Sequence, residues 1–278
     1  MDDRKHIKTP VAIFLDLSKA FDTLNFDILL HKLQYYGISG VPLSLMKSYL
    51  SNRFQYVKYN NFDSSLLEIN AGIPQGSILG PLFFSIYIND LVFSSNKLSY
   101  LLYADDTTLY FNLEDFDKQY LERDITNELN QINVWLKMNK LSLNAEKTKL
   151  MVFHVKQRKV APISIHINNT KIENVEYFNF LGIYLDKSIC WKNHINMLTT
   201  KLSKIVGICN RLKSIYPEHV LLTIYNSLFV SQINYGLLLW GTKLEPIFKI
   251  QKKAIRTLTN QTYIAHSERL LIRTFKSI

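Results

Sequence analysis

The segment LSYLLYADDTTLYF (98–111) places two acidic residues in the middle of an apolar stretch. Apolar residues on both sides of a short polar centre are typical of a β-hairpin, with Asp105 and Asp106 at or near its tip. Taken alone, an Asp-Asp pair in a turn is most often a pair of solvated charges. The segment therefore predicts a hairpin that presents two carboxylates together, and neighbouring segments must decide whether they have a function.

A third carboxylate stands at the end of an upstream segment, VAIFLDL (11–17), which has the composition of a buried strand. Asp16 can be an ordinary strand-end residue. If this strand pairs with the hairpin, however, Asp16, Asp105 and Asp106 meet at one edge of a sheet. Three such anions raise one another's pKa unless a cation neutralises them, and Mg²⁺ prefers oxygen ligands. Two Mg²⁺ ions can assist an in-line phosphoryl displacement, so the pattern indicates nucleotidyl transfer.

Between and beyond these segments, helix and strand patterns alternate until about residue 186. A helix with apolar residues at helical spacing ends at Gly37, and another begins near Pro42. The remaining predicted elements are strands at 54–60 and 65–70, a loop at 72–77, a helix over 78–91, a helix over 115–139, and strand-like segments at 148–155, 163–168 and 178–185. We expect an α+β architecture.

The region after Trp191 changes character and predicts helices, including one after Pro217 and one over 247–258. We place a domain boundary at this change, giving domains at 1–186 and 187–278. Residues 1–150 carry 15 Lys and Arg against 17 Asp and Glu, whereas the remaining residues carry 18 against 6. A basic half can be an ordinary solvated surface, but it also suits contact with nucleic acid phosphates.

Composition excludes several other classes of protein. The chain has 278 residues, of which 47% are hydrophobic, enough for a large buried core. Its two cysteines, Cys190 and Cys209, match no zinc-ligand spacing and suit a reducing compartment. The N-terminal residues lack the apolar stretch of a signal peptide, and no segment is apolar enough for a transmembrane helix. We expect an intracellular protein, in the nucleus, the cytoplasm or both, that does not act at a membrane.

The order of several motifs resembles the palm of reverse transcriptases. The segments that carry the resemblance are FLDLSKAFD (14–22), GIPQGSILGPLFFSIYINDL (72–91), YADD (103–106), LNAEKTKLMVF (143–153) and FLGIYLD (180–186). Together with YNSLFVSQINYGLLLWG (225–241), they are most similar to non-LTR, jockey-like retrotransposon polymerases. The resemblance implies a right-hand palm, an antiparallel sheet backed by helices, followed by a mostly helical thumb.

The resemblance also implies an activity and its cofactors. The family's enzymes are RNA-directed DNA polymerases that add deoxynucleotides to a primer 3′-hydroxyl on an RNA template during retrotransposition. Asp16 and Asp105 would bind both of two Mg²⁺ ions, with Mn²⁺ as a substitute, while Asp106 and the Leu17 carbonyl would complete the site. Phe21 matches the family's steric gate, which rejects a ribose 2′-hydroxyl. Without the resemblance, Phe21 is as well explained by core packing.

Further residues take their expected roles from the same resemblance. Gln75 would contact the incoming nucleotide, and Gly76 would let the backbone approach it closely. Lys147 would lie near the leaving pyrophosphate and protonate it, although Lys149 is an alternative. The other expected contacts are with the primer, through Phe180, Leu181 and Gly182, and with the template–primer, through Lys249, Lys252, Lys253 and Arg256.

The chain also departs from the family's pattern, because it begins only ten residues before the first palm strand. The upstream finger motifs are largely missing, so we expect a polymerase truncated at its N-terminus. Two functions of different kinds follow. The intact carboxylates favour an active polymerase, whereas the missing fingers favour an inactive remnant that only binds nucleic acid. A group II intron-type maturase is a third possibility, although no maturase-like segment is visible.

Overall fold

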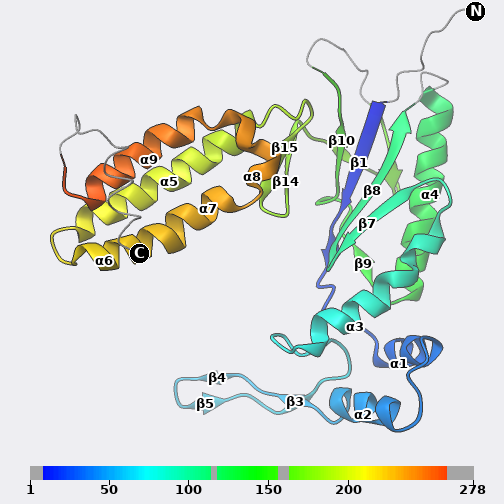
Figure 1. Cartoon of the computed structure of the whole chain (residues 1–278). Helices are drawn as coiled ribbons and strands as arrows, with labels where there is room; N and C mark the ends of the chain where they lie inside the picture. The colour runs from blue at the N-terminus through cyan, green and yellow to red at the C-terminus, as the bar shows by residue number, and fades with distance from the viewer. Residues whose placement is uncertain (1–8, 114–117, 156–162, 262–278) are drawn as a thin grey trace, which may run out of the picture. The chain divides into compact units, whose positions relative to one another are not determined.

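The structure is a computed structural model that describes residues 9–113, 118–155 and 163–261. Residues 1–8, where no signal peptide is predicted, lie outside the described residues, as does the start of the predicted helix over 115–139. The chain divides into two compact units, residues 1–175 and 176–278. Each unit is described by itself, and Figure 1 shows the elements of both.

The first unit combines a mixed sheet with helices and several very short strands. Its described elements are β1 (Thr9–Leu15), β2 (Leu17–Ser18), α1 (Phe26–Tyr35), α2 (Gly40–Leu50), β3 (Phe54–Gln55), β4 (Lys58–Tyr59), β5 (Phe62–Asp63), β6 (Leu67–Glu68), α3 (Leu79–Ile88), the 3-10 helix η1 (Asn89–Ser94), β7 (Ser99–Tyr103), β8 (Asp106–Leu113), α4 (Lys118–Met138), β9 (Ser142–Leu143), β10 (Lys149–Val152), β11 (His166–Ile167), β12 (Thr170–Lys171) and β13 (Glu173–Asn174).

The main sheet has the order β13-β10-β1-β8-β7, with β1 at its centre. As the sequence predicted, β1 is antiparallel to both neighbours, so that Val11 pairs with Phe111 on one side and Val152 on the other. The edge strand β13 is the exception, because it runs parallel to β10. All five side chains at residues 11–15 are buried, although successive side chains of a strand point to opposite faces of the sheet. Both faces of β1 are therefore covered, which explains the unbroken apolar run.

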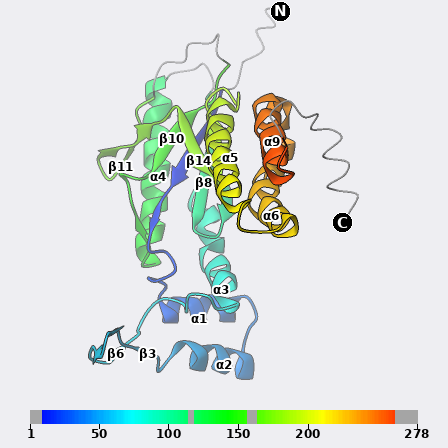
Figure 2. The same cartoon turned by 90° about the vertical axis from the view of Figure 1, so that its left-hand side faces the viewer.

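Helix α4 packs along this sheet (Figure 2). The side chains predicted to form one helix face, Ile125, Leu129, Ile132 and Leu136, are all buried and belong to the same apolar core as Ile13 of β1. An apolar stripe at this spacing stabilises a helix mainly by packing against a second layer. The first unit is therefore a sheet backed by helices, as expected.

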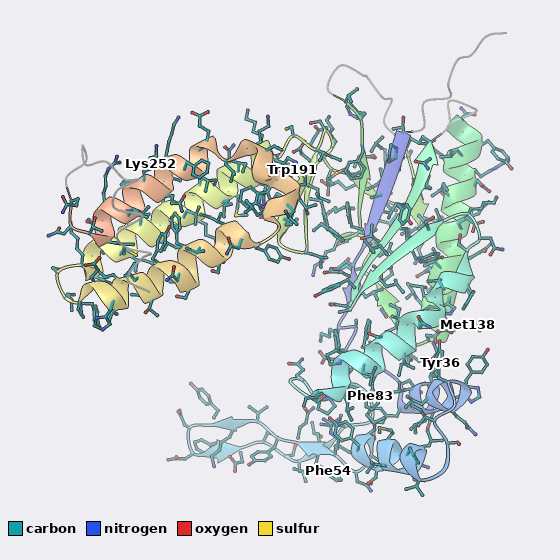
Figure 3. The ribbon with its side chains drawn as sticks, viewed as in Figure 1. Tyr36, Phe54, Phe83, Met138, Trp191 and Lys252 are labelled. Atoms are coloured by element: carbon teal, nitrogen blue, oxygen red, sulfur yellow. The ribbon has the colours of Figure 1, made fainter. Side chains whose placement is uncertain are left out.

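The predicted strands 54–60 and 65–70 form one interrupted hairpin rather than two continuous strands. β3 pairs with β6 and β4 with β5, and the side-chain hydroxyl of Ser64 accepts the Val57 backbone N–H between the two ladders. A side chain that takes a backbone donor competes with the strand ladder, which explains the interruption. The side chains of this hairpin are exposed, including Phe54, labelled in Figure 3.

The second unit begins with a hairpin and continues as helices. Its described elements are β14 (Tyr177–Phe180), β15 (Ile183–Asp186), α5 (Lys192–Leu212), α6 (Glu218–Ile224), the π-helix η2 (Tyr225–Val230), α7 (Ser231–Asn234), α8 (Leu237–Trp240), the 3-10 helix η3 (Gly241–Lys243) and α9 (Glu245–Leu258).

The predicted helices of this region are present, and α5 and α9 lie side by side. Ile195, Leu198, Leu202 and Ile205 of α5 are buried in one core with Ala254 and Leu258 of α9. The hairpin β14–β15 also belongs to this unit, so the division falls before residue 177, whereas the expected domain boundary followed residue 186. In the described ranges, no helix combines the length and the apolar character that crossing a bilayer requires.

Candidate functional site

The three predicted carboxylates lie at one end of neighbouring strands. Asp16 directly follows β1, whose last residue, Leu15, pairs with Thr107 of β8. Asp106 is the residue before Thr107 and opens β8, where it pairs with Tyr103 of β7. Asp105 lies in the turn between β7 and β8. The register therefore brings Asp16 beside the hairpin turn, as the sequence predicted.

These carboxylates are close enough to influence one another's charge. Partial burial and the negative charges of Asp105 and Asp16 raise the pKa of Asp106 above its usual value. Among the described residues, no group of three or more His, Cys, Asp or Glu side chains is arranged to hold a metal ion. The donor chemistry nevertheless fits a hard divalent cation, because all three side chains offer oxygen and a cation relieves their repulsion.

Backbone hydrogen bonds fix the position of Asp16. The backbone N–H of Asn144 donates to the Asp16 carbonyl at 2.8 Å, and the Asp16 N–H donates to the Thr148 hydroxyl at 3.4 Å. Leu17, the next residue, pairs with Leu143 in the β2–β9 ladder. The end of β1 is thus anchored to the segment that follows α4 by several contacts, which fix the backbone position of Asp16.

The same segment carries the predicted lysine. Lys147 lies in a turn closed by Asn144, whose side-chain oxygen accepts the Lys147 backbone N–H at 3.2 Å, and its side chain is exposed. Lys149, the alternative, donates to the Glu173 carboxylate at 2.6 Å and to the Glu146 carbonyl at 2.8 Å. The ammonium group of Lys149 is therefore engaged by Glu173 of β13 and by the Glu146 carbonyl, whereas the side chain of Lys147 is exposed.

Phe21 lies in the turn after β2 and packs against α3, the helix that follows the loop at 72–77. Its ring stacks on that of Phe84 in α3, with ring centroids 4.7 Å apart and an angle of 26° between the planes. Phe84 is fully buried, while Phe21 is half-buried. Core packing therefore accounts for one face of the Phe21 ring and also orients it, so the packing and steric-gate interpretations do not exclude each other.

The loop at 72–77 is bonded to the same turn. The N–H of Gly72 donates to the Leu24 carbonyl at 2.8 Å, and the N–H of Ile73 donates to the Phe21 carbonyl at 3.0 Å. A Cβ on Gly72 would lie 2.6 Å from the carbonyl oxygen of Asp22, closer than real Cβ atoms approach such a group. The loop can therefore pack against the Phe21 turn only because residue 72 has no side chain.

Gln75 and Gly76 are both exposed in this loop. The side-chain amide of Gln75 donates to the Asp22 carboxylate at 3.2 Å, which is a second link between the loop and the Phe21 turn. Gly76 has a φ of +80°, and a Cβ added there would meet nothing within 4 Å. Its glycine is required by this backbone conformation, and the space beside it is open to a ligand.

In the second unit, Phe180, Leu181 and Gly182 form the tip of the hairpin β14–β15. Leu181 and Gly182 are the turn residues, since Phe180 pairs with Ile183. At the other end of β15, buried Asp186 accepts backbone N–H groups from Ser188, Cys190 and Trp191 at 2.9–3.1 Å. Burial would raise the pKa of Asp186, but these hydrogen bonds outweigh it and hold the pKa below its usual value.

The predicted basic face of α9 is present. Lys249, Lys252 and Lys253 are exposed and Arg256 is half-buried, whereas Ala254 and Leu258 on the other side are buried. Lys252 is labelled on the outer side of the helix in Figure 3. Lys249 also forms a surface ion pair with Glu245 at 2.9 Å. The helix therefore presents positive charge to solvent, which suits contact with a phosphate backbone.

Comparison with known proteins identifies the family. Residues 2–185 match the family described as "Reverse transcriptase (RNA-dependent DNA polymerase)". The chain belongs to the reverse transcriptase family. This match covers the main sheet, the three carboxylates and the loop at 72–77, so the residues of the described site lie within the matched region.

Two relatives come from mobile elements of Drosophila melanogaster. The chain is 26% identical to "Probable RNA-directed DNA polymerase from transposon BS", with 94% of this chain and 30% of the relative covered. It is 27% identical to "RNA-directed DNA polymerase from mobile element jockey", with 90% of this chain and 28% of the relative covered. The chain thus spans less than a third of the length of these relatives, which are polymerases of non-LTR retrotransposons.

Solved telomerase structures also show a likeness to this reverse transcriptase chain. The telomerase of Candida albicans in complex with a fragment of telomeric RNA is 14% identical, with a TM-score of 0.42, over 99% of this chain and 48% of the other. A Candida tropicalis telomerase complex gives 11% identity and a TM-score of 0.45, over 100% and 50%.

The structure brings some predicted residues together and adds others that sequence reasoning missed. Asp16, Asp105 and Asp106 interact, and Phe21 and Gln75 are linked through the loop at 72–77. Gly72 and Asp186 were not singled out, although both stand inside quoted motifs. A glycine just before an Ile-Pro pair signals a special backbone position, but only the structure shows which neighbour approaches it.

Proposed function

We propose that this chain carries the nucleotidyl-transfer site of an RNA-directed DNA polymerase from a non-LTR retrotransposon. The observation that carries the proposal is the convergence of Asp16 with Asp105 and Asp106 at one end of β1 and the β7–β8 hairpin, within the part of the chain that matches reverse transcriptases. The substrates would be an RNA template, a DNA primer and deoxynucleoside triphosphates.

Asp16, Asp105 and Asp106 would hold two Mg²⁺ ions, with the Leu17 carbonyl as a further oxygen ligand. When bound, the ions lower the pKa of the primer 3′-hydroxyl and stabilise the leaving pyrophosphate, and Mn²⁺ can supply the same chemistry. The side chain of Lys147, which is exposed in the turn after β9, would donate a proton to the departing pyrophosphate. The hydrogen bonds of the Asp16 backbone fix the position of the residue, which would reduce reorganisation of the site during the reaction.

The remaining predicted residues would hold the substrates. Gln75 and the open side of Gly76 would meet the incoming nucleotide, and Phe21, supported from behind by Phe84, would reject a 2′-hydroxyl. In the second unit, the hairpin tip at 180–182 would contact the primer. The basic face of α9, formed by Lys249, Lys252, Lys253 and Arg256, would follow the phosphate backbone of the template–primer.

Primer extension on an RNA template tests the proposal. The purified chain is assayed with Mg²⁺ and deoxynucleotides beside an Asp105→Ala, Asp106→Ala double variant, and Asp63→Ala serves as the matched control because Asp63 is an exposed acid outside the site. We expect Mg²⁺-dependent extension by the parent and by Asp63→Ala, and none by the double variant.

Each other result has a definite meaning. Extension by the double variant would show that these carboxylates are not the catalytic ligands. No extension by the parent, with template–primer still bound, would favour the alternative function of a chain that only binds nucleic acid. Measuring template–primer binding by fluorescence anisotropy in the same samples separates the two cases.

Nucleotide choice tests the assigned role of Phe21. Phe21→Val removes the ring, so incorporation of ribonucleotides relative to deoxynucleotides should rise about tenfold or more, the order of discrimination that excluding one added group provides. Phe26→Val is the control, because it removes a partly buried aromatic ring from α1, at a position outside the proposed site. An unchanged ratio in Phe21→Val would leave the ring with a packing role only.

A further inference from the structure

The turn between β14 and β15 has an unfavourable backbone conformation. Leu181 has a φ of +48° and Gly182 a φ of +80°, so both turn residues are left-handed, as two-residue hairpin turns of the primed types require. Glycine adopts this conformation freely, but for leucine it is unfavourable, because the Cβ atom comes too close to the backbone. A turn of this kind keeps its shape only if its surroundings hold it there.

Tyr235 makes the contact that holds this turn. Its hydroxyl donates a hydrogen bond to the carbonyl oxygen of Leu181 at 2.5 Å, across 54 residues of sequence. Its ring lies against Gly182, since a Cβ added to that glycine would be 3.5 Å from a ring carbon of Tyr235. One side chain therefore contacts both residues of the turn, and at Leu181 it bonds the backbone of the residue whose conformation is unfavourable.

Tyr235 is itself fixed by its neighbours. It directly follows α7, and its carbonyl oxygen accepts the indole N–H of Trp240 at 3.0 Å. Trp240 is completely buried in the core of the second unit. The next residue, Gly236, is left-handed, with a φ of +65°, and a Cβ there would collide with the side chain of Ile183 in β15. The segment bearing Tyr235 thus packs directly on the hairpin and is anchored in the core behind it.

We propose that Tyr235 is a positioning residue for the primer-contacting turn: its hydroxyl holds the Leu181 carbonyl and so keeps residues 180–182 in the shape that receives the primer strand. This inference rests on the primer role proposed for the hairpin tip. Tyr235 acts through the turn, so its loss changes how well the primer–template is held and leaves nucleotide binding unchanged.

The test compares Tyr235→Phe with the parent chain. The substitution removes one hydroxyl and keeps the ring, so folding is preserved, and the loss of one hydrogen bond weakens the held state of the turn by about three- to tenfold. Tyr216→Phe is the matched control, because Tyr216 is a comparably exposed tyrosine of the same unit, beyond the end of α5. Amide hydrogen exchange, primer–template binding and steady-state kinetics are measured for all three proteins.

In Tyr235→Phe, we expect faster exchange at the amides of 181–183 and a three- to tenfold rise in the Kd and KM for primer–template. The KM for the nucleotide should stay within about twofold of the parent, and Tyr216→Phe should match the parent throughout. Binding and exchange are measurable even if the parent does not extend primers, so a failure of the proposed catalytic function remains distinguishable.

Three results would overturn the inference. If neither exchange nor primer–template affinity changes, the hydrogen bond has no positioning role. If affinity falls while exchange at 181–183 is unchanged, the hydroxyl acts on the nucleic acid directly and not through the turn. If the parent chain does not bind primer–template at all, the hairpin tip has no primer to position.

Discussion

Two hairpins carry predicted site residues, and each closes through a two-residue turn whose first residue is left-handed. In the β7–β8 hairpin this residue is Ala104, with a φ of +51°, and in the β14–β15 hairpin it is Leu181, with a φ of +48°. The surroundings differ. The first turn gathers like charges that raise the pKa of Asp106, whereas the second is held by a hydrogen bond from the Tyr235 hydroxyl.

This difference separates two ways of placing a functional group. The β14–β15 hairpin receives its partners from the protein itself, so its shape is set when the second unit folds. The β7–β8 turn brings together groups that repel one another, and a bound cation would relieve this repulsion. We therefore expect the first hairpin to respond to divalent cations and the second to respond to its own buried contacts.

The largest expected effect is on catalysis at the carboxylate hairpin. Asp16→Asn keeps the size of the side chain and the backbone hydrogen bonds of Asp16 but removes a metal-binding charge. A loss of several kcal/mol in transition-state stabilisation lowers primer extension about a thousandfold. Asp27→Asn, at an exposed position in α1, is the control in the same assay. Extension by Asp16→Asn at near-parental rates would remove Asp16 from the proposed site.

The next effect concerns the stability of the second hairpin. Asp186→Ala leaves several backbone N–H groups without their acceptor and should lower the free energy of unfolding by about 3 kcal/mol at pH 7. Chemical denaturation measures this loss. Glu176→Ala removes an exposed acid that pairs with Lys187 in the same hairpin and should cost less than about 1 kcal/mol.

The same pair of variants gives a pH dependence with a defined sign. The folded-state pKa of Asp186 is lowered, so its stabilising contribution is complete above the ordinary aspartate value of 3.8 and is lost as the pH falls through the lower, folded-state pKa. The difference in stability between the parent and Asp186→Ala should therefore shrink below about pH 4. A difference that stays constant down to acid unfolding would contradict this account of the hydrogen bonds.

Two glycines sharpen the comparison within the second unit. Gly236→Ala forces a Cβ into the Ile183 side chain in a left-handed conformation and should destabilise the unit by about 1–3 kcal/mol. Gly207→Ala, in the middle of α5 with open space around it, should stabilise the unit by about 0.5–1 kcal/mol. Thermal unfolding of both variants tests this, and equal shifts in the same direction would show that the Gly236 contact with β15 is unimportant.

The smallest expected effect returns to the carboxylate hairpin. Asp106→Asn removes one of the repelling charges, so without divalent cations the variant should be slightly more stable than the parent, by less than about 1 kcal/mol. Adding Mg²⁺ should raise the melting temperature of the parent more than that of the variant. NaCl at equal ionic strength controls for screening. Equal responses to Mg²⁺ would mean that the turn does not depend on a cation.

Much of the fold could be predicted from periodicity. The run at 11–15 is apolar because β1 is covered on both faces, and Ile125, Leu129, Ile132 and Leu136 share one helix face because α4 packs on a sheet. The pairing of β13 parallel to β10 could not be predicted, because two-residue strands leave almost no pattern in sequence. The interruption of the hairpin at 54–68 depends on one hydroxyl, that of Ser64, which a propensity argument does not resolve.

The candidate site shows the same limit in a different form. The carboxylates could be found because two of them stand in a hairpin turn and the third at the end of a buried strand, and both features leave local patterns. Tyr235 could not be found, since its partner lies 54 residues away and the bond joins a side chain to a backbone carbonyl. Contacts of this kind depend on the folded chain and leave no periodic signal.

The close approach at Gly72 has a mechanical consequence. Because the backbone at residue 72 lies directly on the backbone at Asp22, with no side chain between them, the segment that bears Phe21 is in direct contact with the one that bears Gln75. A displacement of either is transmitted to the other. A substitution that shifts this backbone contact, such as a side chain added at residue 72, should therefore disturb both the proposed selection of the sugar by Phe21 and the proposed contact of Gln75 with the nucleotide.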